Sequence, residues 1–210
     1  MNKKLLLLAL LTLVAWYSWQ GPLSAPLAED IGRVVEAPAG FNAAVSIGQP
    51  PLQHDLDQPL TIQIDDYLLT LIADFQLEAR VLGRRDYRRD AGSRLAPIDL
   101  ALGWGPMAQA DVIDQIAIRQ RGRFYFWRVE TYPIEHHDIV RNSANMHMIP
   151  ASPAVFAELQ RAERDRHIRL RGFLVNVDRA DGWRWRTSTT RTDSGDGACE
   201  LVLVTAVQVY

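Results

Sequence analysis

The chain has 210 residues, of which 48% are hydrophobic and 23% charged, and its formal net charge is −2 at pH 7. This length suits one domain, or a domain with a tail, and the apolar content is that of an ordinary globular core. The slightly acidic balance gives no electrostatic support for nucleic-acid binding. Cys199 is the only cysteine, so an intramolecular disulfide is excluded and packing must stabilise the fold.

The N-terminus combines two cations with an apolar segment. Lys3 and Lys4 precede the uncharged run Leu5–Trp19, and every later cation is an arginine. A secretory signal has an apolar core of about 7–15 residues, whereas a spanning helix needs about 20 residues. We expect an uncleaved signal-anchor over residues 1–20, because bulky Leu23 makes a poor cleavage site and aromatic residues end the run. A cleaved signal is the alternative.

The two lysines also orient the chain. Under the positive-inside rule they keep the N-terminus in the cytoplasm. We therefore expect a single-pass protein of the cytoplasmic (inner) membrane, which it contacts through Leu5–Trp19, with the C-terminal domain in the periplasm or outside the cell. A cleaved signal would leave the body in the same compartment.

Residues 21–58 have the composition of a linker, rich in proline, alanine and glycine. Proline lacks a backbone donor and fixes φ, and the residues between the prolines show no sustained period. We expect this segment to lift a single globular domain, residues 59–210, off the membrane.

The first half of that domain alternates in the manner of half-buried strands over 60–64 and 75–82. The glycine-rich segment Pro97–Met107 predicts a loop around Trp104. A short helix over 108–115 and a hairpin follow, and the hairpin joins β-rich runs at 116–118 and 124–129 through a turn containing Gly122.

The second half contains local signals of greater specificity. Ser152 followed by Pro153 predicts the N-cap and first turn of a helix. Asp181-Gly182 predicts a tight hairpin turn. The remaining expected elements are a helical turn over 134–141, a short strand over 146–149, a long strand over 168–176 and an apolar closing strand over 201–209.

This order of elements predicts an α+β domain. We expect mostly antiparallel strands forming an OB-like small barrel, with one or two short helices and the N-terminal membrane helix. The OB fold is a small Greek-key barrel of five strands, and a helix between the third and fourth strands is part of the expected pattern.

Three segments are distinctive: PIDLALGWGPM (97–107), NSANMHMIPA (142–151) and GDGACE (195–200). They resemble an uncharacterised family of exported, membrane-anchored bacterial proteins, and the resemblance extends over residues 75–210. It implies a location in the bacterial envelope. It implies no particular chemistry, since no activity is assigned to that family.

Most histidines lie between residues 135 and 147. His136 and His137 are adjacent, so their side chains point to different sides of a helix or strand. The spacings H-x-x-x-H and H-E-x-x-H do not occur. The acidic stretch 193–200 lacks the ligand spacing of an EF-hand. We therefore expect no metal and no cofactor.

A row of alternating polar residues, Ser143, Asn145 and His147, would share one face of a strand. Buried polar groups need partners, so such a row either lines a ligand pocket or forms a structural network that holds the loop around Trp104. We take the row, together with Asp99 and Trp104, as candidate ligand-binding residues.

Cys199 admits two interpretations. It could act as a nucleophile with His147 as base and Asn145 as orienter, although no cysteine-protease signature surrounds it. The apolar run after it instead predicts a buried, unreactive thiol. Trp183 and Trp185 alternate with arginines on the expected hairpin. Such a face could stack on nucleic-acid bases, but the acidic balance and the export signal favour core or rim packing.

Two functions follow from these observations. The first is non-enzymatic: a membrane-anchored envelope module that binds or scaffolds a protein partner or a small ligand. The second is an envelope hydrolase that uses His147 with Asp99 or Cys199. No residue carries a recognisable catalytic signature, and we expect no nucleic-acid partner.

Overall fold

The computed structural model describes residues 41–193, 195 and 197–210. The expected signal-anchor and most of the expected linker lie outside these residues. Within them, no helix is both long and apolar enough to cross a membrane.

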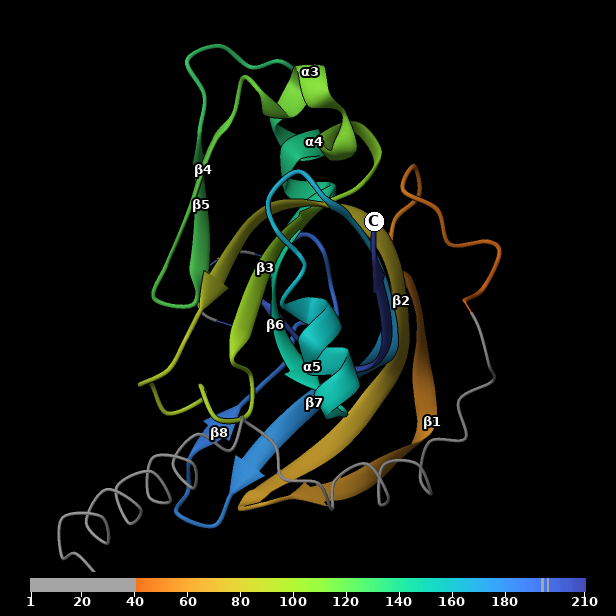
Figure 1. Cartoon of the computed structure of the whole chain (residues 1–210), viewed down its shortest axis with the longest axis vertical. Coiled ribbons are helices and arrows are strands. Elements are labelled where there is room, and N and C mark those ends of the chain that lie inside the picture. Colours follow the sequence, from red (N-terminus) through yellow and green to blue (C-terminus); the bar gives the residue numbers. More distant parts are fainter. Residues whose placement is uncertain (1–40, 194, 196) are drawn as a thin grey trace, which may run out of the picture.

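The strands form a small barrel-like domain, because their pairings close into a ring (Figure 1). In order of pairing the strands are β2 (Tyr67–Asp86), β3 (Ile98–Gly103), β6 (Ser143–Pro150), β9 (Glu200–Val209) and β7 (His167–Arg179). The ring closes because β7, the last of these, also pairs with β2, the first. One pair, β6 with β9, is parallel, and the other pairs of the ring are antiparallel. The predicted α+β class with mostly antiparallel strands is confirmed.

Alternate side chains of each barrel strand fill the interior. This core takes apolar residues from all the barrel strands, including Phe75, Leu100, Met146, Leu170 and Val202. Helix α5 (Pro153–Leu159) contributes Val155 and Leu159 to the same core. Its predicted N-cap is confirmed, since the Ser152 side chain accepts a hydrogen bond from the Val155 amide at 3.2 Å.

Strand β1 (Leu52–Ile64) pairs with the N-terminal half of β2. Its register shifts between Asp55 and Leu60, where Pro59 lies. Ile62 and Ile64 pack with β2, β7 and β9 in a second apolar core outside the barrel interior.

The folded part begins earlier than the expected boundary at residue 59. Strand β1 already starts at Leu52, Val45 is buried, and the Asn42 amide donates to Gln76 Oε1 at 3.0 Å. The expected linker over 21–58 is therefore wrong in its last part. Its prolines mislead because Pro50 and Pro51 precede the strand and Pro59 lies at an irregularity, where a missing donor does not break the pairing.

The chain between β3 and β6 forms a separate unit beside the barrel. It holds the predicted hairpin, which is confirmed as β4 (Ala117–Arg121) and β5 (Phe124–Arg128). The short helices of this segment are η1 (Gly105–Ala108), α3 (Ala110–Ile113) and α4 (His136–Arg141). Together with α5 they exceed the one or two helices expected. The unit packs on Leu82 and Ala101 of the barrel strands through a third apolar core.

The segment Ile98–Gly103 is a buried strand, so the loop expected over Pro97–Met107 is wrong for its first part. Its apolar residues fill the barrel interior, while its other face is covered by the hairpin unit. A strand buried on both faces lacks the simple polar alternation of a half-exposed one. Glycine at position 103 allows the end of β3 to lie close to the backbone of Met107, because a Cβ at this position would be 2.5 Å from the Met107 carbonyl oxygen.

The chain leaves β7 through the predicted Asp181-Gly182 turn and returns as β8 (Arg184–Trp185). Gly182 has φ of 89°, as a tight turn requires. Trp183 and Trp185 pack beside the second core, with ring centroids 5.7 Å apart. Arg184 and Arg186 both pair with Asp178.

Candidate functional site

Strands β3 and β6 bring the predicted polar residues together on the face that points away from the barrel interior. The register places Asp99 opposite His147, and Ala101 opposite Asn145. The exposed fractions are 0% for Asp99, 2% for Asn145 and 2% for His147. Asn145 and His147 therefore share a buried face, as their period of two predicted, and Asp99 joins them from the neighbouring strand.

Arg123 supplies the positive charge beside Asp99. It lies in the β4–β5 turn with φ of 74°, and its Nη1 donates to Asp99 Oδ1 at 2.6 Å. The same guanidinium donates to both carboxylate oxygens of Asp90, at 2.8 and 3.0 Å, and its carbon lies 3.8 Å from the centre of the Tyr87 ring. A buried carboxylate requires such pairing. Arg123 was not among the predicted site residues, although an aspartate within an apolar segment is a reason to look for a nearby cation.

Asn145 links the hairpin to the barrel. Its Oδ1 accepts a hydrogen bond from Gln120 Nε2 at 2.8 Å, and its Nδ2 donates to the Arg123 carbonyl oxygen at 3.0 Å. The same Nδ2 lies 3.5 Å from Asp99 Oδ2 and 3.8 Å from Cys199 Sγ. One side chain thus contacts β3, the hairpin and the start of β9.

Cys199 is half-buried directly before β9. Its Sγ donates to the Arg123 carbonyl oxygen at 3.6 Å. Burial raises the pKa of the thiol to about 12, and the hydrogen bond from Asn145 only partly opposes this. Because the thiolate is the nucleophilic form, the thiol is unreactive near neutral pH in this arrangement.

His147 is held between Asp99 and Trp185. Its Nδ1 lies 2.9 Å from Asp99 Oδ1, although the two groups are not aligned as a hydrogen bond. The Trp185 ring of β8 covers the imidazole, with centroids 4.6 Å apart. His147 and Cys199 both line a cavity of about 210 Å³, together with Arg123, Phe124, Arg184, Trp185, Arg186 and Gly197.

The other two predicted site residues lie apart from this cluster. Trp104 is fully buried in the barrel core. Asn145 and His147 contact the segment 97–107 through Asp99, as expected, but residues 98–103 of this segment form a strand and not a loop. Ser143 stands at the start of β6, where its hydroxyl donates to the Ile139 carbonyl oxygen at 2.7 Å and lies 2.9 Å from the Tyr125 hydroxyl.

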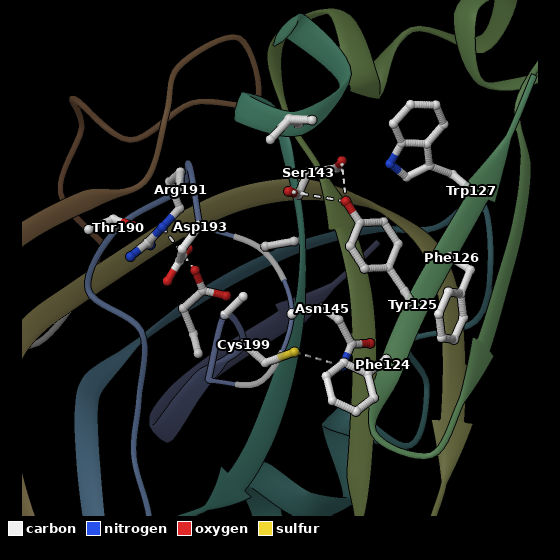
Figure 2. Close-up of a pocket in the computed structure, with 15 residues that line it drawn as sticks. Phe124, Tyr125, Phe126, Trp127, Ser143, Asn145, Thr190, Arg191, Asp193 and Cys199 are labelled. Carbon is white, nitrogen blue, oxygen red and sulfur yellow. Dashed lines mark hydrogen bonds and ion pairs between the residues drawn. The ribbon is translucent and has the colours of Figure 1, made fainter. Parts of the chain in front are cut away.

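A larger pocket of about 310 Å³ lies between the hairpin and the segment 190–199. Figure 2 shows the side chains of β5 on one side of it, Arg191 and Asp193 on the other, and Ser143, Asn145 and Cys199 between them. The aromatic wall consists of Phe124, Tyr125, Phe126 and Trp127. This aromatic run predicted a strand of the hairpin, and none of its residues was among the predicted site residues.

Glu200 is the buried carboxylate of this pocket, with an exposed fraction of 1%. Its Oε1 lies 2.9 Å from Arg191 Nε, but these groups are not aligned as a hydrogen bond. Neither carboxylate oxygen accepts a hydrogen bond from another described side chain or backbone group. Burial raises the pKa of Glu200 to about 7, against the opposing charge of Arg191.

The paired histidines do not join either cavity. The His136 ring packs against Trp127 and Tyr132, with centroids 5.4 and 6.0 Å apart, and His137 is exposed beside Asp138. Among the residues the structure describes, no group of three or more His, Cys, Asp or Glu side chains is placed to hold a metal ion.

Comparisons of this chain with protein-family models, curated proteins and solved structures give no match. The three distinctive sequence segments nevertheless meet in the fold. Segment 97–107 contains β3, segment 142–151 contains β6, and segment 195–200 ends at the start of β9. These strands are neighbours in the ring, and the polar cluster lies where they meet.

Proposed function

We propose that this protein is a ligand-binding module of the bacterial envelope, and that its site is the pocket between β5, β6 and the segment 190–199. The observation that carries the proposal is a concave site with an aromatic wall and a few convergent polar groups, Ser143, Asn145 and Cys199. Pockets for small molecules have this composition. The occupant is a small ligand or a side chain of a partner protein.

The strand pairings support an OB-like assignment of the barrel. The five barrel strands in chain order are β2, β3, β6, β7 and β9. Around the ring, the first strand pairs with the second, the second with the third, the third with the fifth, the fifth with the fourth, and the fourth with the first. Helix α5 lies between the third and the fourth strand in the chain. OB folds bind ligands on the face of their second and third strands and on the loops after the first and fourth. The corresponding parts here are β3, β6 and residues 87–97 and 180–199, which surround the polar cluster and the pocket.

The polar cluster serves this pocket as a support. Asn145 and Arg123 connect the hairpin that carries the aromatic wall to the barrel, through contacts with Gln120, Asp99 and Cys199. Groups locked in this way keep a binding site in one geometry. The location in the envelope rests on the N-terminal sequence, with residues 1–20 as an anchor in the inner membrane.

A fragment screen with a blocked variant tests the binding function. Small aromatic compounds that are neutral, cationic or anionic would be screened by ligand-observed NMR against the full chain in a mild detergent. Ala198→Phe fills the pocket, while Ala157→Phe places the same ring on the exposed face of α5 and serves as the matched control. We expect bound fragments to be lost with Ala198→Phe only. Fragments bound equally by both variants would contradict the proposal.

A hydrolase that uses His147 with Asp99 or Cys199 is the second candidate. It is favoured by the cavity that His147 shares with Cys199 and by the position of Asp99 Oδ1, 2.9 Å from His147 Nδ1, because a hydrolase of this kind needs a histidine base near a nucleophile and a third group. Against Cys199 as the nucleophile stands its thiol pKa of about 12. Hydrolysis of an activated nitrophenyl ester that is lost in His147→Gln, but kept in Ala198→Phe, would place this candidate first.

A further inference from the structure

We infer that the pocket between β5 and the segment 190–199 takes a ligand with a cationic amine, and that the Glu200 carboxylate receives it. This inference rests on the proposed binding function and specifies its ligand class. It is carried by the contacts of Glu200 and by the chemistry of the pocket walls.

The first argument is the incomplete pairing of Glu200. Asp99, the other buried carboxylate of this region, accepts a 2.6 Å hydrogen bond from Arg123. Glu200 is just as buried, yet neither of its oxygens accepts a hydrogen bond from another described residue. Leaving a buried charge without donors costs free energy. An ammonium group would supply aligned donors together with a positive charge, whereas Arg191 supplies the charge without the alignment.

The second argument is the composition of the walls. Among the described residues that line the pocket, Asp193 and Glu200 are acidic and Arg191 is the basic one. The opposite wall presents the rings of Phe124 and Trp127. Aromatic faces attract cations, so both sides of the pocket favour a positively charged ligand, and one with an apolar body fits the aromatic wall.

Access to Glu200 requires Arg191 to move aside. Arg191 contacts Glu200 without hydrogen-bond alignment. Among the described residues it also donates from Nη2 to Gln53 Oε1 at 3.0 Å, and its guanidinium carbon lies 5.6 Å from the centre of the Phe75 ring. An ammonium that makes aligned, charge-assisted hydrogen bonds to Glu200 is the stronger partner. The ligand amine thus replaces the Arg191 guanidinium at the carboxylate.

The test compares three probes of similar shape and different charge: phenethylamine, 2-phenylethanol and 3-phenylpropionate. Their dissociation constants would be measured by NMR titration with the full chain in detergent, for wild type, Glu200→Gln and the matched control Glu163→Gln, an exposed residue outside the pocket. We expect the amine to bind about tenfold more tightly than the alcohol, the size of one charge-assisted hydrogen bond. Glu200→Gln should remove this preference, and Glu163→Gln should keep it.

A second variant keeps the test valid if Glu200→Gln fails to fold. Phe124→Leu retains the apolar wall but removes an aromatic face, and it should reduce the preference for the amine by about threefold. The inference is overturned if wild type binds the amine no better than the alcohol, if it prefers the acid, or if both variants keep the amine preference.

The probes also separate the two proposals. If the alcohol or the acid binds at least as tightly as the amine and Ala198→Phe prevents this binding, the pocket is a binding site and only the amine inference fails. If none of the probes binds, or if Ala198→Phe leaves their binding unchanged, the amine inference fails together with the binding site on which it rests.

Discussion

Two buried carboxylates, Asp99 of β3 and Glu200 of β9, lie in the two strands that flank β6 and are stabilised by different means. Asp99 has a hydrogen-bonded counter-ion in Arg123. Glu200 has only the unaligned contact with Arg191. The first arrangement suits a structural ion pair. The second leaves a carboxylate whose protonation state changes near neutral pH, because burial raises its pKa to about 7.

Glu200 should make the protein less stable as the pH rises. Its pKa is 4.5 when exposed and about 7 in the fold, so the folded state holds the proton more tightly. The difference in pKa therefore adds about 3 kcal/mol to the free energy of unfolding at low pH. This stabilisation is complete below pH 4.5 and is lost as the pH rises through 7. Urea unfolding at pH 5 and pH 8 should show this loss in wild type and not in Glu200→Gln. Equal pH dependence in the two proteins would contradict the assignment.

Arg123→Gln should destabilise the fold by about 3–5 kcal/mol, because it leaves Asp99 buried without its counter-ion. Arg121→Gln, on the exposed part of the same hairpin, is the matched control and should change stability by less than about 0.5 kcal/mol. Adding Asp99→Asn to Arg123→Gln should recover part of the loss. The cycle consists of wild type, Arg123→Gln, Asp99→Asn and the double variant, each measured by chemical denaturation. If the two single effects simply add in the double variant, the pair is not coupled.

Cys199 should react slowly with a bulky thiol reagent in the native protein. Burial holds its pKa at about 12, so little thiolate forms at neutral pH. Cys199→Ser should lower the free energy of unfolding by about 1–3 kcal/mol, because a hydroxyl fits this half-buried site poorly. Spectrophotometric labelling of native and urea-unfolded chains gives the comparison. Equally rapid labelling of the native and the unfolded chain would show that the native thiol is accessible to the reagent.

At the scale of elements, the barrel depends on one close approach between β7 and β9. The register of this pair shifts between Arg171 and Gly172. A Cβ on Gly172 would lie 1.8 Å from the Leu203 carbonyl oxygen. Glycine inside a strand marks such a contact between backbones.

Gly172→Ala should therefore destabilise the protein by about 3 kcal/mol or more, since backbone rather than a flexible side chain must move. Gly48→Ala is the matched control, because nothing lies within 4 Å of a Cβ built there. Thermal melting measures both. If the Gly172→Ala protein melts at the same temperature as the control, β7 and β9 can move apart without a loss of stability, which would contradict the prediction.

At the scale of the whole molecule, the domain includes residues that the sequence assigned to a linker. Arg169 Nη2 donates to the carbonyl oxygens of Asn42 and Val45, at 2.8 and 3.0 Å, and so ties residues 42–45 to β7. Together with β1, these contacts make residues 42–64 part of the folded body, which therefore begins before residue 59.

Limited proteolysis should therefore leave a stable fragment that still contains residues 42–59. The proline-rich composition of residues 21–40 predicts the first cuts there. Mass spectrometry of the time course identifies the fragment. Early cuts between residues 46 and 59 would contradict the docking of this segment and restore the later boundary.

The sequence alone determined the elements whose signals are local. Ser152-Pro153 specified a helix start and Asp181-Gly182 a hairpin turn, because capping and turn geometry depend on adjacent residues. The period of two over residues 143–147 was sufficient to place Asn145 and His147 on one face. The same rule failed for Ile98–Gly103, whose strand is covered on both sides.

Tertiary structure decided which of these residues meet. Asp99 and Arg123 are joined by the return of the hairpin across the barrel, and Arg191 and Glu200 by the path of the chain into β9. Neither pair has a fixed sequence spacing, because loop lengths and strand register set the distance between such residues. The residue types therefore indicated a polar cluster, while only closure of the barrel determined that Asp99 has a counter-ion and that Glu200 faces an aromatic pocket.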